Sequence, residues 1–184
     1  HAVLSTAEYL EKRDYSVTKV PVDSAGLVDP EEVRKAIQPD TALISIMHVN
    51  NEIGSIQPLA EIGAIAREAG VLFHTDAVQS AGKLPLDVEA LHVDLLSLSA
   101  HKFYGPKGVG ALYLRKGTRL SPLLHGGTQE RNRRAGTHNI PGIVGLAKAL
   151  EISVARMEED TARERTLRDR LWAGLEGAIP CIQL

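Results

Sequence analysis

Apolar positions along the chain fall into short, nearly continuous runs, separated by stretches in which apolar residues recur at helical spacing. Runs of this length, rich in Val, Ile and Leu and bounded by turn-forming residues, are typical of buried β-strands. Residues 41–49 are almost continuously apolar, which predicts a strand covered on both faces. Further strands are expected at residues 71–78, 93–98 and 109–114, and a shorter one at residues 15–22.

The residues that begin and end helices mark three shorter helices. Residues 2–12 carry apolar side chains at the spacing of one helix face. Asp29 is a predicted N-cap followed by proline, and Glu32 is placed to return a bond to the cap N–H, so a helix should extend to about Ile37. Another helix is expected at residues 59–69, because Pro58 precedes it and Gly70 follows it.

Strands that alternate with helices at short spacing predict an α/β fold, with a mostly parallel sheet flanked by helices. In such sheets, ligands bind outside the carboxyl ends of the strands. Polar side chains follow three of the predicted strands, and we expect them to converge on one edge: His48 and Asn51, then His74, Asp76 and Gln79, then Ser99, His101 and Lys102.

A long helix sets the expected domain organisation. It should begin at Pro141 and reach about Leu175, and its interleaved charges over residues 158–170 are typical of a solvated face. Long helices with polar surfaces commonly connect two domains. We therefore expect residues 1–157 to form part of one large domain, and residues 158–184 to contain the end of the linking helix and the start of a second domain.

Composition limits the classes of function. The 184 residues carry a formal net charge of −2 without a basic stripe, so we expect no nucleic-acid partner. No apolar run reaches the length of a membrane span, and no signal peptide opens the chain. Cys181 is the single cysteine, which favours a reducing, cytoplasmic compartment, and its apolar neighbours predict packing rather than reactivity. The chain begins at His1 without Met and stops in an apolar phrase, so we expect a fragment.

Metal and nucleotide sites receive little support from the motifs. His48, His74, His101 and His125 are available as ligands, but none of the usual zinc-ligand spacings occurs. No glycine-rich dinucleotide motif follows a predicted strand, and no P-loop is present. We therefore expect no metal site.

Lys102 is the first candidate for chemistry. It follows a buried strand, although ammonium groups are almost never fully buried unless they are paired. The alternative is a lysine whose stem lies along the loop while its charge reaches water. A hydroxyl, an imidazole and several glycines surround Lys102 in the sequence, and this setting suits an amine that condenses with a carbonyl beside a phosphate.

Asp76 is the second candidate, because a carboxylate at the end of an apolar strand needs a cationic partner. Pyridoxal phosphate could supply one at its ring nitrogen. Gln79 could donate to the phenolic oxygen of the same ring, and Asn51 could reach the same region. The alternatives are that Asp76 caps a helix and that Gln79 lies on its first turn.

Hydroxyl and imidazole groups could hold the phosphate. Ser99 and His101 lie two residues apart, so in an extended chain they point the same way, and both can donate. A serine and a histidine at this spacing, without other evidence, are more often packed in a core or used to cap a helix. Thr137 is another hydroxyl in a glycine-rich loop, and its spacing alone favours an ordinary surface loop.

Four motifs, at residues 47–59, 74–88, 99–113 and 125–139, together resemble the cysteine desulfurases of the nitrogen-fixation and iron–sulfur-cluster type. These enzymes belong to the class-V aminotransferase-like family. The resemblance implies a pyridoxal-phosphate enzyme of the fold type I transferases, here part of its large domain. It also implies removal of sulfur from L-cysteine, which leaves L-alanine and an enzyme persulfide for iron–sulfur cluster assembly.

Site residues follow from the same resemblance. It implies that Lys102 holds the cofactor as a Schiff base and that Asp76 pairs with the pyridine nitrogen. It implies further contacts of Gln79 with the phenolic oxygen, and of Asn51 with cofactor and substrate carboxylate. The remaining implied contacts are to the phosphate, from Ser99 and His101 and, across a homodimer interface, from Thr137.

The chain also departs from the family pattern. The histidine that stacks on the cofactor ring is expected just before His1, and the downstream loop with the sulfur-accepting cysteine and the arginine that clamps the substrate carboxylate are absent. Cys181 falls too early to be that cysteine. We therefore expect these residues alone to be inactive.

Other functions remain open at this point. The cofactor could serve a selenocysteine lyase or another enzyme of the same fold type. The residues could instead form a truncated dimerisation module without turnover. A sulfur-acceptor or scaffold protein as partner is implied by the resemblance only.

Overall fold

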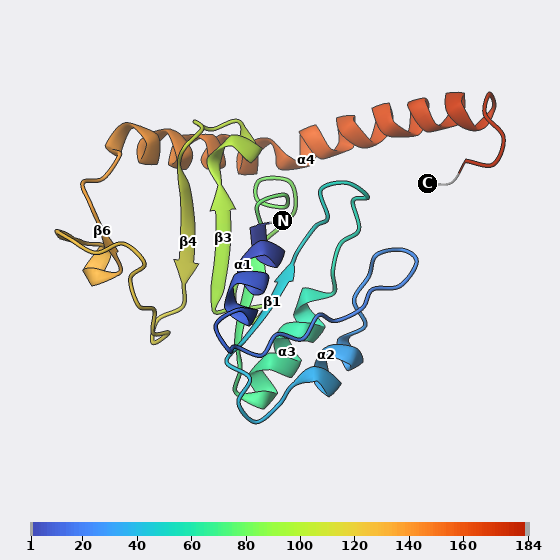
Figure 1. Cartoon of the computed structure of the whole chain (residues 1–184). Coiled ribbons are helices and arrows are strands. Elements are labelled where there is room, and N and C mark those ends of the chain that lie inside the picture. Colours follow the sequence, from blue (N-terminus) through green and yellow to red (C-terminus); the bar gives the residue numbers. More distant parts are fainter. Residues whose placement is uncertain (1, 183–184) are drawn as a thin grey trace.

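The structure, a computed structural model, describes residues 2–182. In chain order its elements are α1 (Ala2–Glu11), α2 (Pro30–Ala36), β1 (Leu43–Met47), α3 (Leu59–Ala69), β2 (Leu72–Asp76), β3 (Leu95–Ser99), the 3₁₀ helix η1 (Ala100–Phe103), β4 (Gly110–Leu114), β5 (Thr128–Gln129), the 3₁₀ helix η2 (Glu130–Asn132), β6 (Arg134–Ala135) and α4 (Ile140–Glu176) (Figure 1).

The main sheet has four strands in the order β1-β2-β3-β4. β1 and β2 are parallel, β2 and β3 are parallel, and β4 runs antiparallel to β3. The change of direction follows from the short connection at residues 100–109, because a parallel crossover needs a dozen or more residues. The prediction of an α/β fold with a mostly parallel sheet is confirmed.

One face of this sheet packs against α2 and α3, which lie side by side (Figure 1). The strands β1, β2 and β3 contribute Ile44, Phe73 and Leu96 to one buried cluster. Val33 of α2 and Ile62 of α3 belong to the same cluster. Burying each such side chain contributes about 1.5–3 kcal/mol. This core fixes the strands whose carboxyl ends carry the candidate site.

Helix ends follow the predicted signals with one exception. Gly70 ends α3 in the left-handed region, with φ of 67°, and its N–H donates to the carbonyl oxygen of Ala66. The Asp29 carboxylate caps α2 by accepting the N–H of Glu31 at 2.9 Å. The return bond expected from Glu32 is wrong, because its carboxylate accepts from the ammonium of Lys35 at 2.7 Å instead.

Two predictions about strands are wrong. Residues 15–22 form no strand, and Val22 makes only an isolated bridge to Val28. Pro21 lacks the N–H that a longer ladder would need. β1 is not covered on both faces either, since Leu43 is 50% exposed whereas Ile44, which points to the opposite face, is 8% exposed.

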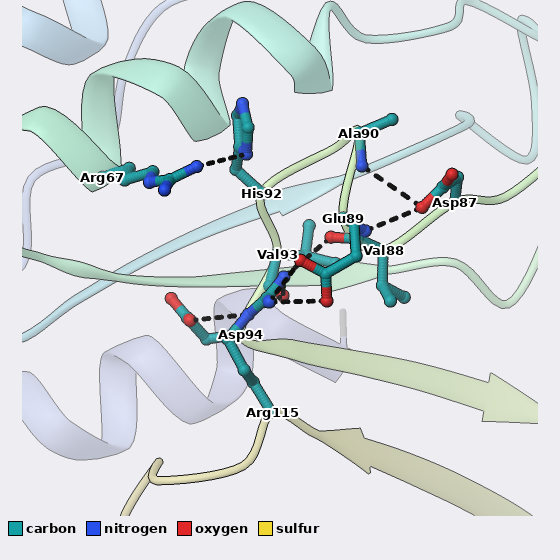
Figure 2. A network of polar contacts seen from close by, with 9 residues as sticks. All are labelled: Arg67, Asp87, Val88, Glu89, Ala90, His92, Val93, Asp94 and Arg115. Carbon is teal, nitrogen blue, oxygen red and sulfur yellow. Dashed lines mark hydrogen bonds and ion pairs between the residues drawn. The ribbon is translucent and has the colours of Figure 1, made fainter.

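Arg115 ties the end of β4 to the segment that leads into β3 (Figure 2). Its Nη1 donates to both carboxylate oxygens of Glu89 at 2.7 and 2.8 Å. Its Nε and Nη2 donate to the carbonyl oxygen of Val93 at 3.1 and 3.0 Å, and Nε lies 3.3 Å from the Asp94 carboxylate. Asp94 in turn accepts the N–H of Phe73 at 2.9 Å. The hydrogen bonds to Glu89 are the main cause that raises the pKa of Arg115.

The long helix α4 begins and ends close to the predicted residues and runs along the edge at which β3 ends (Figure 1). Leu150 packs against the cluster that contains Phe103. Further along α4, the Thr161 hydroxyl donates to the carbonyl oxygen of Lys83 at 3.4 Å. Beyond it Leu171 is 64% exposed. The division into domains at residue 157 stays a prediction.

Cys181 follows α4 and is exposed, so the prediction that it packs in an apolar setting is wrong. Apolar neighbours in the sequence bury a thiol only where another element covers them. Across residues 2–182, none of the helices combines the length and the apolarity that crossing a bilayer requires.

Candidate functional site

The three parallel strands bring their carboxyl ends to one edge of the sheet, as predicted. Met47 at the end of β1 is the register partner of Asp76 at the end of β2, and Asp76 is the partner of Ser97 near the end of β3. The ladder continues past the strands, because the N–H of His48 donates to the Asp76 carbonyl oxygen at 2.9 Å. The N–H of Ala77 likewise donates to the Ser97 carbonyl oxygen at 3.1 Å. The segments that carry the candidate residues therefore leave the sheet side by side.

Asp76 begins a tight turn that its own side chain stabilises. Its Oδ1 accepts the N–H of Val78 at 2.9 Å, so the half-buried carboxylate is held in one orientation. Ala77 and Ser80 are fully buried and anchor the turn to the core. Gln79 lies between them in sequence and is half-buried on the same turn.

Lys102 lies on η1, the 3₁₀ turn that follows β3. Side chains three residues apart eclipse in such a turn. Ala100 and Phe103 are both fully buried, so this pair anchors the turn. Lys102 is half-buried between them, and within residues 2–182 neither an ion pair nor a side-chain hydrogen bond engages its ammonium. Tyr104 closes the turn at φ of 65°, a strained conformation for a bulky residue.

The two turns pack against each other. Ala81, at the end of the Asp76 turn, belongs to the same buried cluster as Ala100 and Phe103, which flank Lys102. A methyl group built on Gly82 would lie 3.5 Å from the Cβ of Phe103. The structure thus brings the segments that carry Asp76 and Lys102 together at one edge.

Ser99 and His101 lie at the rim of this edge. The Oγ of Ser99 is 2.9 Å from the Nδ1 of His101, so the two side chains point the same way, as expected from their spacing. His101 is exposed and Ser99 is half-buried. Their bond to each other uses one of their two hydrogens, so both can donate to an anion that approaches from solvent only when this bond opens.

Asn51 and Thr137 lie on other segments of the chain. Asn51 is exposed in the turn after β1, where the neighbouring Asn50 accepts the N–H groups of Glu52 and Ile53 at 2.8 and 3.1 Å. Thr137 is exposed and follows β6, in the small hairpin that lies beyond β4 on the side away from β1 (Figure 1). Within one chain the structure does not bring Thr137 to the turns of Asp76 and Lys102.

Two histidines near the edge are bonded in ways that the sequence did not indicate. The Nδ1 of His74 is 2.8 Å from the Oγ of Ser45, and its Nε2 is 2.9 Å from the Oγ of Ser97. The Nδ1 of buried His48 is 2.9 Å from the Oγ of buried Ser80. Burial lowers the pKa of both histidines, although the charge of Asp76 partly opposes this for His74.

These contacts had only weak signals in the sequence. Ser45 and Ser97 interrupt apolar strands at positions that share a face with His74, and this polar row was the available sign. Nothing in the sequence linked His48 to Ser80. No group of three or more metal-ligating side chains occurs among residues 2–182.

The arrangement defines what the edge can do chemically. A half-buried amine can attack a carbonyl, and a carboxylate on the neighbouring turn can hold a cation. Hydroxyl and imidazole donors at the rim can bind a phosphate. Together these groups suit a small aromatic ring that carries an aldehyde, a basic nitrogen and a phosphate.

Comparison with known proteins gives one consistent family. The sequence profile described as "Aminotransferase class-V" matches residues 1–184. A cysteine desulfurase IscS from Methanosarcina thermophila is 60% identical over 175 residues, which are 95% of this chain and 43% of that protein. A cysteine desulfurase IscS from Dictyoglomus turgidum is 53% identical over 184 residues, which are 100% of this chain and 47% of that protein.

Solved structures agree. A structure titled "NifS-like protein" superposes with a TM-score of 0.92 at 49% identity, and the match covers 96% of this chain and 49% of the other. The chain therefore spans about half the length of the relatives that it matches.

Proposed function

The chain belongs to the class-V aminotransferase family, and on this premise we propose that its protein is a pyridoxal-phosphate-dependent cysteine desulfurase. Its substrate would be L-cysteine and its products L-alanine and an enzyme persulfide, whose sulfur serves iron–sulfur cluster assembly. One observation carries the proposal most directly. A half-buried amine and an oriented carboxylate lie on two turns that pack together at the carboxyl edge of the sheet.

The residues present fit pyridoxal phosphate by their chemistry. Lys102 would hold the cofactor covalently through its amine, and Asp76 would accept a hydrogen bond from the protonated pyridine nitrogen. A charge-assisted bond of this kind is worth about 1.5–3 kcal/mol. Its bond to Val78 leaves the Asp76 carboxylate in a fixed orientation, so little reorganisation is needed. When bound, the cofactor supplies an electron sink for charge that develops at the substrate's α-carbon.

The remaining residues would orient the ring and the phosphate. Gln79 would donate to the phenolic oxygen, and Ser99 and His101 would donate to phosphate oxygens. Asn51 would contact the cofactor and the substrate carboxylate from the turn after β1.

We also propose that the protein is a homodimer, in which Thr137 reaches the phosphate of the partner subunit. Its exposed position beyond β4 is compatible with a role outside its own chain. The proposed sulfur acceptor is a scaffold protein in the cytoplasm. We assign the sulfur-accepting thiol to a residue other than Cys181, which follows the long helix α4.

The test measures alanine and sulfide released from L-cysteine by the full-length protein in the presence of a thiol reductant. We expect Lys102→Ala to abolish both products and the visible absorbance of the bound cofactor. Lys107→Ala is the matched control, because Lys107 is an exposed lysine on the following turn, and this variant should keep its activity. Retained turnover in Lys102→Ala would refute the proposal.

A further inference from the structure

His48 connects the end of β1 to the turn of Asp76 through its backbone. Its N–H donates to the Asp76 carbonyl oxygen at 2.9 Å, and its own carbonyl oxygen accepts the N–H of Gln57 at 2.8 Å. The backbone of His48 is therefore bonded on both sides and cannot shift without breaking the ladder. Its side chain is 6% exposed, so the ring is enclosed by the same part of the fold.

The imidazole of His48 reaches the far end of that turn. Its Nδ1 is 2.9 Å from the Oγ of Ser80, a residue that is fully buried. The Ser80 hydroxyl also donates to the carbonyl oxygen of Ala77 at 3.2 Å. With the hydroxyl hydrogen used in this way, the Nδ1–H tautomer of His48 donates to Ser80 and satisfies both buried groups.

The turn between these anchors carries two of the proposed ring contacts. Asp76 is its first residue, and Gln79 directly precedes Ser80. Asp76 Oδ1 fixes only the start of the turn, through the N–H of Val78. The bond from His48, which directly follows β1, is a side-chain contact from another segment that fixes the end of the turn.

We propose that His48 is a positioning residue of the cofactor site, which acts through Ser80 to set the orientation of Asp76 and Gln79 toward the pyridoxal ring. The inference rests on the proposed function. His48 itself touches neither cofactor nor substrate in this scheme. A buried, neutral imidazole suits the role, because a fully bonded polar pair inside the fold specifies one geometry. Burial lowers the pKa of His48 and so keeps the ring neutral near neutral pH.

Three variants of the full-length protein test this role. His48→Leu keeps bulk but removes the hydrogen bond, and Ser80→Ala removes the partner while it keeps His48. His48→Asn places an amide atom at the position of Nδ1 and should restore the bond. The readouts are the dissociation constant for pyridoxal phosphate, the position of the visible absorption band of the bound cofactor, and the thermal stability of the cofactor-free protein.

We expect His48→Leu and Ser80→Ala each to raise the dissociation constant roughly tenfold, the equivalent of one hydrogen bond. Both variants should shift the absorption band in the same direction, because both release the contacts of Asp76 and Gln79 with the ring. The double variant should be no worse than either single variant, since the two residues act in series. His48→Asn should return the band and the affinity close to those of the unmodified protein.

An unchanged band and affinity in Ser80→Ala and His48→Leu, with only the stability lowered, would overturn the inference and leave His48 a packing residue. Additive effects in the double variant would also overturn it. If His48→Leu does not fold, the comparison of Ser80→Ala with His48→Asn decides by the same readouts. If the unmodified protein does not bind pyridoxal phosphate at Lys102, the proposed function itself fails, which is a separate and recognisable result.

Discussion

Gly82 and Ser153 meet so closely that a methyl group on Gly82 would lie 2.7 Å from the Cβ of Ser153. Gly82 follows the turn of Asp76, and Ser153 lies on α4, where its hydroxyl donates to the carbonyl oxygen of Phe103 at 3.3 Å. Phe103 is the residue after Lys102. The helix α4 is therefore packed against both turns of the proposed site, and the spacing between Asp76 and Lys102 depends on this contact.

Gly82→Ala should destabilise the protein by about 2–4 kcal/mol, from the left-handed backbone and the collision with Ser153 together. Gly82 has φ of 73°. Gly70→Ala is the matched control, because Gly70 has φ of 67° but open space around the added methyl group, so only the backbone cost of about 1–2 kcal/mol applies. Urea unfolding measures both. Equal losses in the two variants would show that the contact with α4 is not tight.

Asp76→Asn should weaken the function of the site without loss of the fold. The amide oxygen can still accept the N–H of Val78, which Asp76 Oδ1 accepts at 2.9 Å, but the negative charge is removed. Loss of a charge-assisted bond of about 1.5–3 kcal/mol corresponds to a fall in kcat of roughly 10- to 100-fold. Steady-state kinetics with L-cysteine and circular dichroism test this together. Unchanged kcat would argue that Asp76 faces no cationic group.

Arg115→Lys should lower the free energy of unfolding by about 1–3 kcal/mol, because lysine cannot reproduce the planar set of donors to Glu89 and Val93. The absorption of the bound cofactor should stay unchanged, since Arg115 pairs with Asp94 just before the start of β3, whereas Lys102 follows the end of that strand. Arg168→Lys is the control, as its ion pair with Asp169 is exposed on both sides and should contribute less than about 1 kcal/mol. Similar losses in both variants would contradict this account of Arg115.

Stability should fall as the pH drops below the usual histidine pKa of 6.5, in part because of His74. Burial lowers the pKa of folded His74, although Asp76 partly opposes the shift. Below pH 6.5 the unfolded chain therefore binds a proton that the folded chain excludes, until the pH reaches the lowered folded value. The stability that neutral His74 contributes is present above pH 6.5 and is lost below it.

His74→Gln should reduce this dependence by up to about 1.4 kcal/mol per pH unit. The measurement is the free energy of unfolding at pH 7 and pH 5 for both proteins. The same difference between the two pH values in both would exclude a contribution from His74.

Sequence patterns were sufficient where the structure is determined locally. Asp29 and Gly70 mark helix ends by their own backbone chemistry, and both were predicted correctly. The parallel order of β1, β2 and β3 follows from the helical and loop segments between them, and it places Asp76 and Lys102 on one edge. The anchors of the proposed site were therefore accessible from the sequence.

Burial and long-range contacts could not be predicted from local sequence patterns. The bond from His48 to Ser80 joins residues 32 positions apart, and it depends on the register of two strands and a turn. Leu43 and Cys181 sit in apolar sequence yet are exposed, because cover comes from elements that a local run cannot specify. The segment at residues 15–22 alternates like a strand but pairs only through one isolated bridge at Val22.

The most direct test of the central claim is to locate the lysine that binds the cofactor. The full-length protein is incubated with pyridoxal phosphate, reduced with borohydride, digested, and its peptides are mapped by mass spectrometry. The account predicts that the phosphopyridoxyl mass lies on Lys102, the half-buried amine beside the turn of Asp76. A label confined to another lysine, such as Lys83 or Lys107, would contradict it.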